Sequence, residues 1–97
     1  MPTYVSLINW TQEGISNVMD SPKRADAFIA LALKLGAVAQ IWYTMGQYDA
    51  VSIIEAPSDA IVMQLLFELR KLGNVKTQTM KAWSPPEAAK LFARLNP

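Results

Sequence analysis

The fold is decided in the middle of the chain, where residues 37–55 read AVAQIWYTMGQYDAVSIIE. β-Branched and aromatic residues are frequent in both halves of this stretch, and Gly46-Gln47 stands between them. Two strand-like runs joined by a short link that contains glycine predict an antiparallel hairpin. We expect its strands over about residues 37–45 and 48–55.

A strand and then a helix are predicted before the hairpin, and a helix and then a strand after it. Upstream, residues 3–10 predict a strand, Thr11 caps a short helix, and residues 21–35 predict a longer helix capped by its serine. Downstream, a helix over about 59–72 precedes a strand over 75–83. This order predicts an α+β, ferredoxin-like split βαβ fold (βαββαβ), with a four-stranded antiparallel sheet and helices on one face. Right-handed crossovers put the first and third strands in the centre.

The end of the chain predicts one more helix. Ser84-Pro85-Pro86-Glu87 places serine at the cap, proline at the first helical position and glutamate at the third, which is the pattern of a capping box. An apolar stripe follows, made of Ala88, Leu91, Phe92 and Leu95. We treat residues 1–97 as a single domain in which residues 84–97 form a C-terminal helical extension.

The composition excludes several kinds of chemistry. The 97 residues include no cysteine and no histidine, which removes disulfides, thiolate nucleophiles and the commonest metal and haem ligands. Nine basic and eight acidic residues give a net charge of +1, so we expect no nucleic-acid partner. No pair of carboxylates has ligand spacing, so no bound metal or other cofactor is expected. No signal peptide or membrane-spanning run is visible, which favours a cytoplasmic location without a membrane partner.

Alternate residues of the predicted strands separate into two faces. One is almost wholly apolar and suits packing under the helices: Val5, Leu7, Ile41, Tyr43, Val51 and Ile53. The other mixes aromatic side chains with hydroxyls and an amide: Tyr4, Ser6, Ile8, Trp10, Gln40, Trp42, Thr44, Ser52, Ile54, Thr77, Thr79 and Trp83. This mixed face favours a subunit interface or the lining of a ligand cavity over the wet surface of a monomer.

The predicted helix over residues 59–72 carries more apolar surface than one sheet can cover. Met63 and Phe67 fall outside the apolar face that its other large residues form. Either the C-terminal helix covers them or another subunit does. Together with Ile8 and Ile54, they are the predicted interface residues of a homodimer or larger assembly.

Turn and helix-start residues supply the candidates for a site, each with a structural alternative. Asp49, next to Tyr48 at the hairpin end, either caps backbone N–H groups or lines a cavity mouth and accepts from Arg24 or Lys23. Arg24 is either half of an ion pair, which we favour, or an anion handle at a helix start. Asn9-Trp10, at the end of a central strand, either border the core or form a cavity wall.

Several segments resemble the GYD-domain family. They are Asn9-Trp10-Thr11, Asp20-Ser21-Pro22-Lys23-Arg24, Met45-Gly46-Gln47-Tyr48-Asp49, Glu55-Ala56-Pro57 and Leu72-Gly73-Asn74-Val75-Lys76-Thr77. The resemblance runs through about residue 84, and the Gly-Tyr-Asp turn that names the family has a glutamine after its glycine here. It implies a ferredoxin-like subunit whose sheets pair between subunits, as in dimeric α/β barrels. It implies no catalytic residue, and the family's biochemical role is unassigned.

We therefore expect a homo-oligomeric binding or assembly module whose aromatic, hydroxyl-lined sheet face encloses a small molecule. The expected partners are a second copy of the chain and a small apolar or aromatic ligand. The alternative is a cofactor-independent enzyme of the dimeric α/β-barrel type, monooxygenase-like or isomerase-like, which analogy of fold alone supports. The candidate ligand-binding residues are Asn9, Trp10, Arg24, Trp42, Thr44, Tyr48, Asp49, Thr77 and Thr79.

Overall fold

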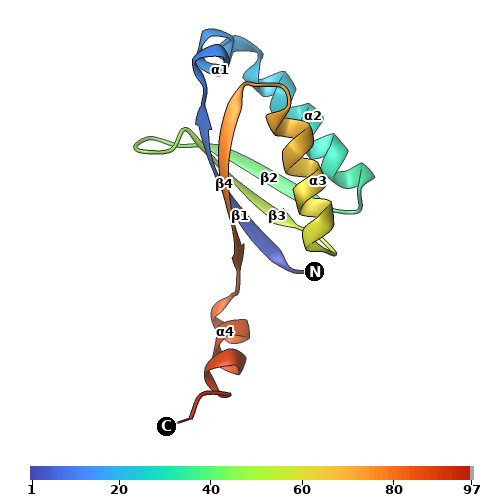
Figure 1. Cartoon of the computed structure of the whole chain (residues 1–97), viewed down its shortest axis with the longest axis vertical. Helices are drawn as coiled ribbons and strands as arrows, with labels where there is room; N and C mark the ends of the chain where they lie inside the picture. Colours follow the sequence, from blue (N-terminus) through green and yellow to red (C-terminus); the bar gives the residue numbers. More distant parts are fainter. Residues whose placement is uncertain (97) are drawn as a thin grey trace.

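A computed structural model describes residues 1–96 and contains the elements in the predicted order (Figure 1). The sheet and its two long helices are β1 (Thr3–Trp10), α2 (Ser21–Lys34), β2 (Val38–Tyr43), β3 (Ala50–Glu55), α3 (Asp59–Arg70) and β4 (Val75–Ala82). The connection from β1 to α2 and the end of the chain add α1 (Gln12–Ser16), the 3₁₀ turn η1 (Val18–Asp20) and α4 (Pro85–Phe92). Both hairpin strands are shorter than predicted, because residues 44–49 form the loop between them.

All neighbouring strands pair antiparallel, in the order β2-β3-β1-β4. β1 and β3 thus lie in the centre of the sheet, as right-handed crossovers require. α2 and α3 contact each other and cover one face of the sheet, while the opposite face carries no helix (Figure 1). The predicted ferredoxin-like α+β arrangement is confirmed.

Short polar side chains fix the helix starts. At α1, Thr11 Oγ1 accepts from the Gly14 amide at 3.1 Å. The predicted capping box of α4 is present: Ser84 N donates to Glu87 Oε1 at 2.9 Å, and Glu87 N donates to Ser84 Oγ at 3.3 Å. The predicted cap at Ser21 is wrong, because this serine is already the first helical residue of α2.

The helices cover a different set of strand residues from the one we predicted. Three cross-strand rows face α2 and α3: Ala39-Ile54-Tyr4-Lys81, Ile41-Ser52-Ser6-Thr79 and Tyr43-Ala50-Ile8-Thr77. Three rows lie on the open face: Val38-Glu55-Thr3-Ala82, Gln40-Ile53-Val5-Met80 and Trp42-Val51-Leu7-Gln78. The predicted interface role of Ile8 and Ile54 is therefore wrong, since these side chains are 6% and 0% exposed in the core. Conversely, four residues predicted under the helices lie on the open face: Val5, Leu7, Val51 and Ile53.

Small, hydrogen-bonded side chains explain why this face is the covered one. Ser6 and Ser52 are fully buried in the middle row. Thr79 Oγ1 donates a hydrogen bond to Ser6 Oγ at 2.9 Å. Ser52 Oγ donates to the Gln40 carbonyl at 2.8 Å. Buried hydroxyls with partners are tolerated in a core, and their small volume lets helices that carry large side chains such as Leu65 come close.

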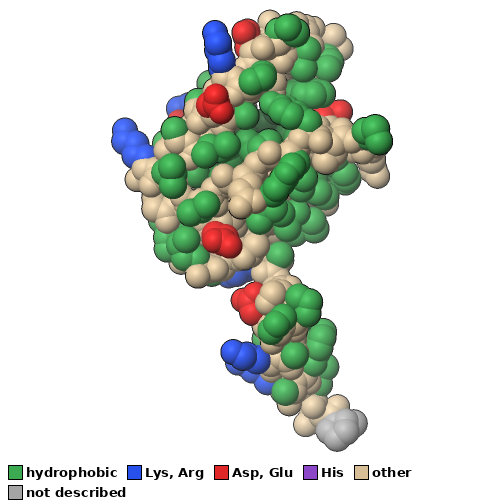
Figure 2. Space-filling model, turned by 180° about the vertical axis from the view of Figure 1, so that it is seen from behind, with side chains coloured by type: hydrophobic (Ala, Val, Ile, Leu, Met, Phe, Trp, Pro, Cys, Tyr) green, Lys and Arg blue, Asp and Glu red, His purple; other side chains and the backbone are tan. Residues whose placement is uncertain are grey.

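α4 projects from the end of β4 and stands clear of the sheet and of the other helices (Figure 1). The molecule measures 52 × 31 × 18 Å and its radius of gyration is 15.0 Å, against about 12.5 Å for a compact chain of this length. Trp83, Phe92 and Leu95 are 51%, 67% and 69% exposed along this arm. Figure 2 shows hydrophobic side chains along one side of it.

Candidate functional site

Five predicted site residues meet where the β2–β3 loop contacts the end of β1. Asp49 Oδ2 accepts from the Trp10 amide at 2.9 Å and from Asn9 Nδ2 at 3.4 Å. Thr44 Oγ1 donates to the Tyr48 carbonyl at 2.6 Å, and the Thr44 amide donates to the carbonyl of Asp49 at 3.0 Å. These bonds hold the loop against β1. Asp49 therefore has the capping role, and it does not accept from Arg24.

Arg24 extends from the first turn of α2 into the space between the helices and the sheet. Its Nη1 donates to the Asn17 carbonyl at 3.1 Å, and its Nη2 is buried without a hydrogen-bond partner. The two ion pairs found among residues 1–96 do not include it, so the predicted ion pair of Arg24 is wrong. Arg24 and Trp10 both line a cavity of about 50 Å³.

The remaining predicted ligand residues lie apart from that cavity. Trp42 is on the open face of the sheet and is 51% exposed. Thr77 and Thr79 face the helices from β4. The nine candidates are thus divided among the loop end, the cavity and the two sheet faces, and they do not form one site.

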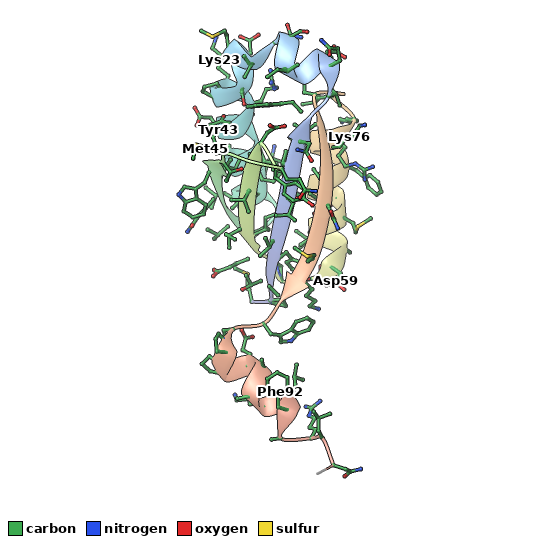
Figure 3. All side chains as sticks on the ribbon, turned by 90° about the vertical axis from the view of Figure 1, so that its left-hand side faces the viewer. Lys23, Tyr43, Met45, Asp59, Lys76 and Phe92 are labelled. Carbon is green, nitrogen blue, oxygen red and sulfur yellow. The ribbon has the colours of Figure 1, made fainter. Side chains whose placement is uncertain are left out.

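The open face of the sheet, which faces the viewer in Figure 3, has an apolar centre that we call the open-face patch. It consists of Val5, Leu7, Val38, Trp42, Val51, Ile53 and Met80. Val38, Trp42 and Met80 are 42%, 51% and 45% exposed. Polar residues surround the patch: Thr3, Asn9, Gln40, Glu55, Lys76 and Gln78. An apolar centre inside a polar rim is the anatomy of a protein–protein interface.

Met63 and Phe67 of α3 form a second exposed apolar surface, at 49% and 55% exposure. α4 does not cover them, because it points away from α3 (Figure 1). The guanidinium carbon of Arg70 lies 6.0 Å from the centre of the Phe67 ring. The predicted cover by the C-terminal helix is therefore wrong, and both side chains are exposed in the single chain.

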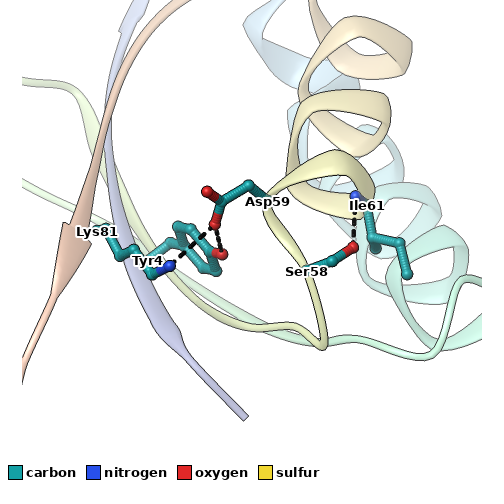
Figure 4. Close-up of polar contacts among 5 residues, drawn as sticks. All are labelled: Tyr4, Ser58, Asp59, Ile61 and Lys81. Carbon is teal, nitrogen blue, oxygen red and sulfur yellow. Dashed lines mark hydrogen bonds and ion pairs between the residues drawn. The ribbon is translucent and has the colours of Figure 1, made fainter.

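A polar cluster at the other end of the sheet was missed in the sequence. Tyr4 OH donates to Asp59 Oδ1, and Lys81 Nζ lies 3.2 Å from the same oxygen (Figure 4). The hydrogen bond to Asp59, with burial adding to it, raises the pKa of Tyr4 from 10.0 to about 12. The same bond and the Lys81 ammonium lower the pKa of Asp59.

This Tyr4–Asp59–Lys81 cluster connects β1, β4 and the start of α3. Tyr4 and Lys81 both bind Asp59 Oδ1, which is the behaviour of a structural tie. The only signal in the sequence is indirect: Tyr4 and Lys81 become neighbours through the β1–β4 register. Residues 1–96 contain no group of three carboxylates placed to hold a metal ion, and no helix long and apolar enough to cross a membrane.

The comparison with protein families decides the relationship that the sequence motifs suggested. The model of the GYD domain matches residues 4–92. The chain belongs to the GYD-domain family. The matched region extends past residue 84, where the visible resemblance ended, and it includes all of α4. The helix of the projecting arm is therefore within the matched part of this GYD protein.

Two proteins from Thermus thermophilus are similar to this GYD protein. The first is a curated relative named "Glutamine synthetase and cystathionine beta-lyase binding protein", 32% identical over 98 residues, covering 98% of this chain and 99% of the relative. The second is the crystal structure of TTHA0845, with a TM-score of 0.57 and 21% identity, covering 87% of this chain and 95% of that one. At this identity, the structural match shows the shared fold alone.

Proposed function

We propose that this GYD protein is a homo-oligomeric binding module in which the open-face patch of one copy packs against the same patch of a second. The observation that carries the proposal is the patch itself, an apolar centre on a sheet face without a helix over it. Soluble monomers rarely expose such continuous apolar surface. Two sheets packed in this way make a dimeric α/β barrel.

Two large side chains of the patch, on the outer strands β2 and β4, indicate how much free energy association could gain. Trp42 and Met80 are about half exposed in a single copy. Full burial of a large apolar side chain is worth about 1.5–3 kcal/mol. A twofold interface uses every such residue twice, so a few of these side chains suffice for a stable pair.

The positions of the hydroxyl side chains argue against a polar ligand between two paired sheets. Ser6, Ser52 and Thr79 face the helices, so they are not available to line a cavity between two sheets. The paired faces are instead apolar, which favours assembly over enclosure of a polar molecule. The enzyme alternative takes second place, because the titratable groups of the Tyr4–Asp59–Lys81 cluster are already paired.

We also propose that the assembly binds other proteins, in the cytoplasm. The name of the Thermus relative, which states that it binds glutamine synthetase and cystathionine beta-lyase, supports this. The arm supplies a suitable surface, since Phe92 and Leu95 are 67% and 69% exposed on it. Such exposed apolar residues are typical of protein contacts.

Sedimentation equilibrium at micromolar concentration tests the self-association. We expect a dimer or a multiple of it for the wild type, and monomers for Trp42→Glu and Met80→Glu. Leu33→Glu is the matched control, because Leu33 is 62% exposed on α2, outside the patch. A compact wild-type monomer, or an L33E variant that dissociates as readily as W42E, contradicts the proposal.

A pull-down with the purified glutamine synthetase and cystathionine beta-lyase of the same host tests the second part. We expect at least one of these enzymes to be retained by the wild type and lost with Phe92→Ser. Met19→Ser is the control, because Met19 is 89% exposed in η1 and lies outside the arm. Equal retention by both variants rejects the arm as the contact surface.

A further inference from the structure

A cavity of about 50 Å³ lies between the helices and the sheet, close to the start of α2. Its walls are largely apolar, with Phe28, Ile41, Leu69 and Leu72 among them. Among its lining residues Arg24 is the only charged one. This cavity is on the helix side of the sheet, so it is separate from the open-face patch.

The guanidinium of Arg24 is incompletely satisfied in this setting. Nη1 donates to the Asn17 carbonyl at 3.1 Å, but Nη2 is buried and has no acceptor. A buried donor without a partner is unfavourable, more so when it carries charge. An acceptor supplied by a bound molecule would remove that cost.

A second donor lines the same cavity. Ser21 Oγ and Tyr43 OH lie 2.9 Å apart, and both residues belong to the wall. One hydroxyl proton is used between the two oxygens, so the other remains free to donate. Ser21 also begins α2, where the helix dipole favours negative charge. Two free donors, Arg24 Nη2 and one hydroxyl of the Ser21–Tyr43 pair, thus face one apolar space.

We propose that this cavity binds a small monocarboxylate, with its carboxylate on Arg24 Nη2 and the free hydroxyl of the Ser21–Tyr43 pair. Its alkyl group lies against the apolar wall formed by residues such as Phe28. One cation among apolar walls selects a monoanion, because a second charge would be buried without a partner. A water needs about 10–15 Å³ of such space, so a volume of about 50 Å³ fits a ligand of the size of acetate or propionate.

Titration of the full-length protein with propionate, followed by ¹H–¹⁵N NMR, tests this site. We expect saturable shifts of the Trp10 indole signal, while the Trp42 indole on the open face stays in place. Arg24→Met removes the charge and keeps the stem, and it should weaken binding by at least about tenfold. Arg70→Met is the control, because Arg70 lies over Phe67 and not at the cavity.

Three results would overturn the proposal. They are equal propionate binding by R24M and R70M, binding of benzoate or inorganic phosphate as tight as that of propionate, and no saturable shift in the wild type. Should R24M fail to fold, the double variant Ser21→Ala, Tyr43→Phe replaces it, because it removes whichever hydroxyl donates to the carboxylate. Weaker propionate binding is then expected, and unchanged binding overturns the site. The outcome is independent of sheet pairing, since a monomer keeps this cavity complete.

Discussion

The two neighbouring isoleucines of β3 offer a direct test of how the sheet is used. Ile54 is 0% exposed beneath the helices, whereas Ile53 points to the open face and is partly exposed. Ile54→Ala and Ile53→Ala are the same chemical change one residue apart. We predict that they lower two different free energies, that of folding for Ile54 and that of association for Ile53.

The expected loss for Ile54→Ala follows from its complete burial. Truncation of a fully buried isoleucine to alanine costs about 2–5 kcal/mol, because a cavity remains. That is a large part of the total of about 5–15 kcal/mol for a domain. With about 4–8 °C per kcal/mol at this size, the melting temperature should fall by at least about 8 °C.

Ile53→Ala leaves no closed cavity, so its folding cost is smaller. Its remaining exposed surface is lost only on association, which we take as about 1 kcal/mol, less than the 1.5–3 kcal/mol of a full burial. In a twofold pair the loss counts twice, giving about 2 kcal/mol and a dissociation constant about 30-fold weaker.

Two measurements separate these effects. Thermal unfolding followed by circular dichroism, at a concentration where the chain is monomeric, reports on the protomer alone. Sedimentation over a concentration series gives the dissociation constant. A larger drop in melting temperature for I53A than for I54A would falsify the assignment of the faces. An unchanged dissociation constant for I53A would reject the sheet face as the interface.

Three further predictions concern single contacts. In an ultraviolet titration one tyrosine should ionise near pH 12, the pKa of Tyr4. Tyr4→Phe should abolish that step, and because an unfolded tyrosine ionises near pH 10, the wild type should lose stability relative to Y4F as the pH rises from about 10 to 12. Gly14→Ala should lower the melting temperature, since an added Cβ would lie 1.9 Å from the Asn74 carbonyl oxygen and overpacking costs about 1–3 kcal/mol; an unchanged melting temperature contradicts this. Ser84→Ala should reduce the helical circular dichroism of α4 by removing a cap worth about 1 kcal/mol, with no change in the melting of the sheet.

The order of elements could be predicted because local chemistry determines it. The Gly46-Gln47 link and the Ser84–Glu87 capping box are short-range signals, and both elements they predict are present. Alternation along β1 and β3 also separated two faces correctly. It did not say which face the helices cover, because that depends on how close the helices can approach small residues such as Ser6 and Ser52.

The candidate site was less predictable, because its contacts connect distant parts of the chain. Asp49 and Arg24 are both charged and both near turns, but the fold separates them. Asp49 accepts hydrogen bonds from β1, whereas Arg24 lines the cavity between the helices and the sheet. The pairing of Tyr4 with Asp59 joins residues 55 positions apart and has no local signal. Only the strand register and the placement of α3 bring these groups together.

The arm formed by α4 has a consequence for how this protein can diverge. Since α4 stands clear of the core, a substitution of Leu91 or Phe92 leaves the free energy of folding of the sheet and its two long helices unchanged. Only the molecules that touch the arm would respond to it. Proteins built on the same sheet and helices can therefore exchange one set of contacts for another in this segment while their melting temperatures stay the same, so specificity and stability can change separately.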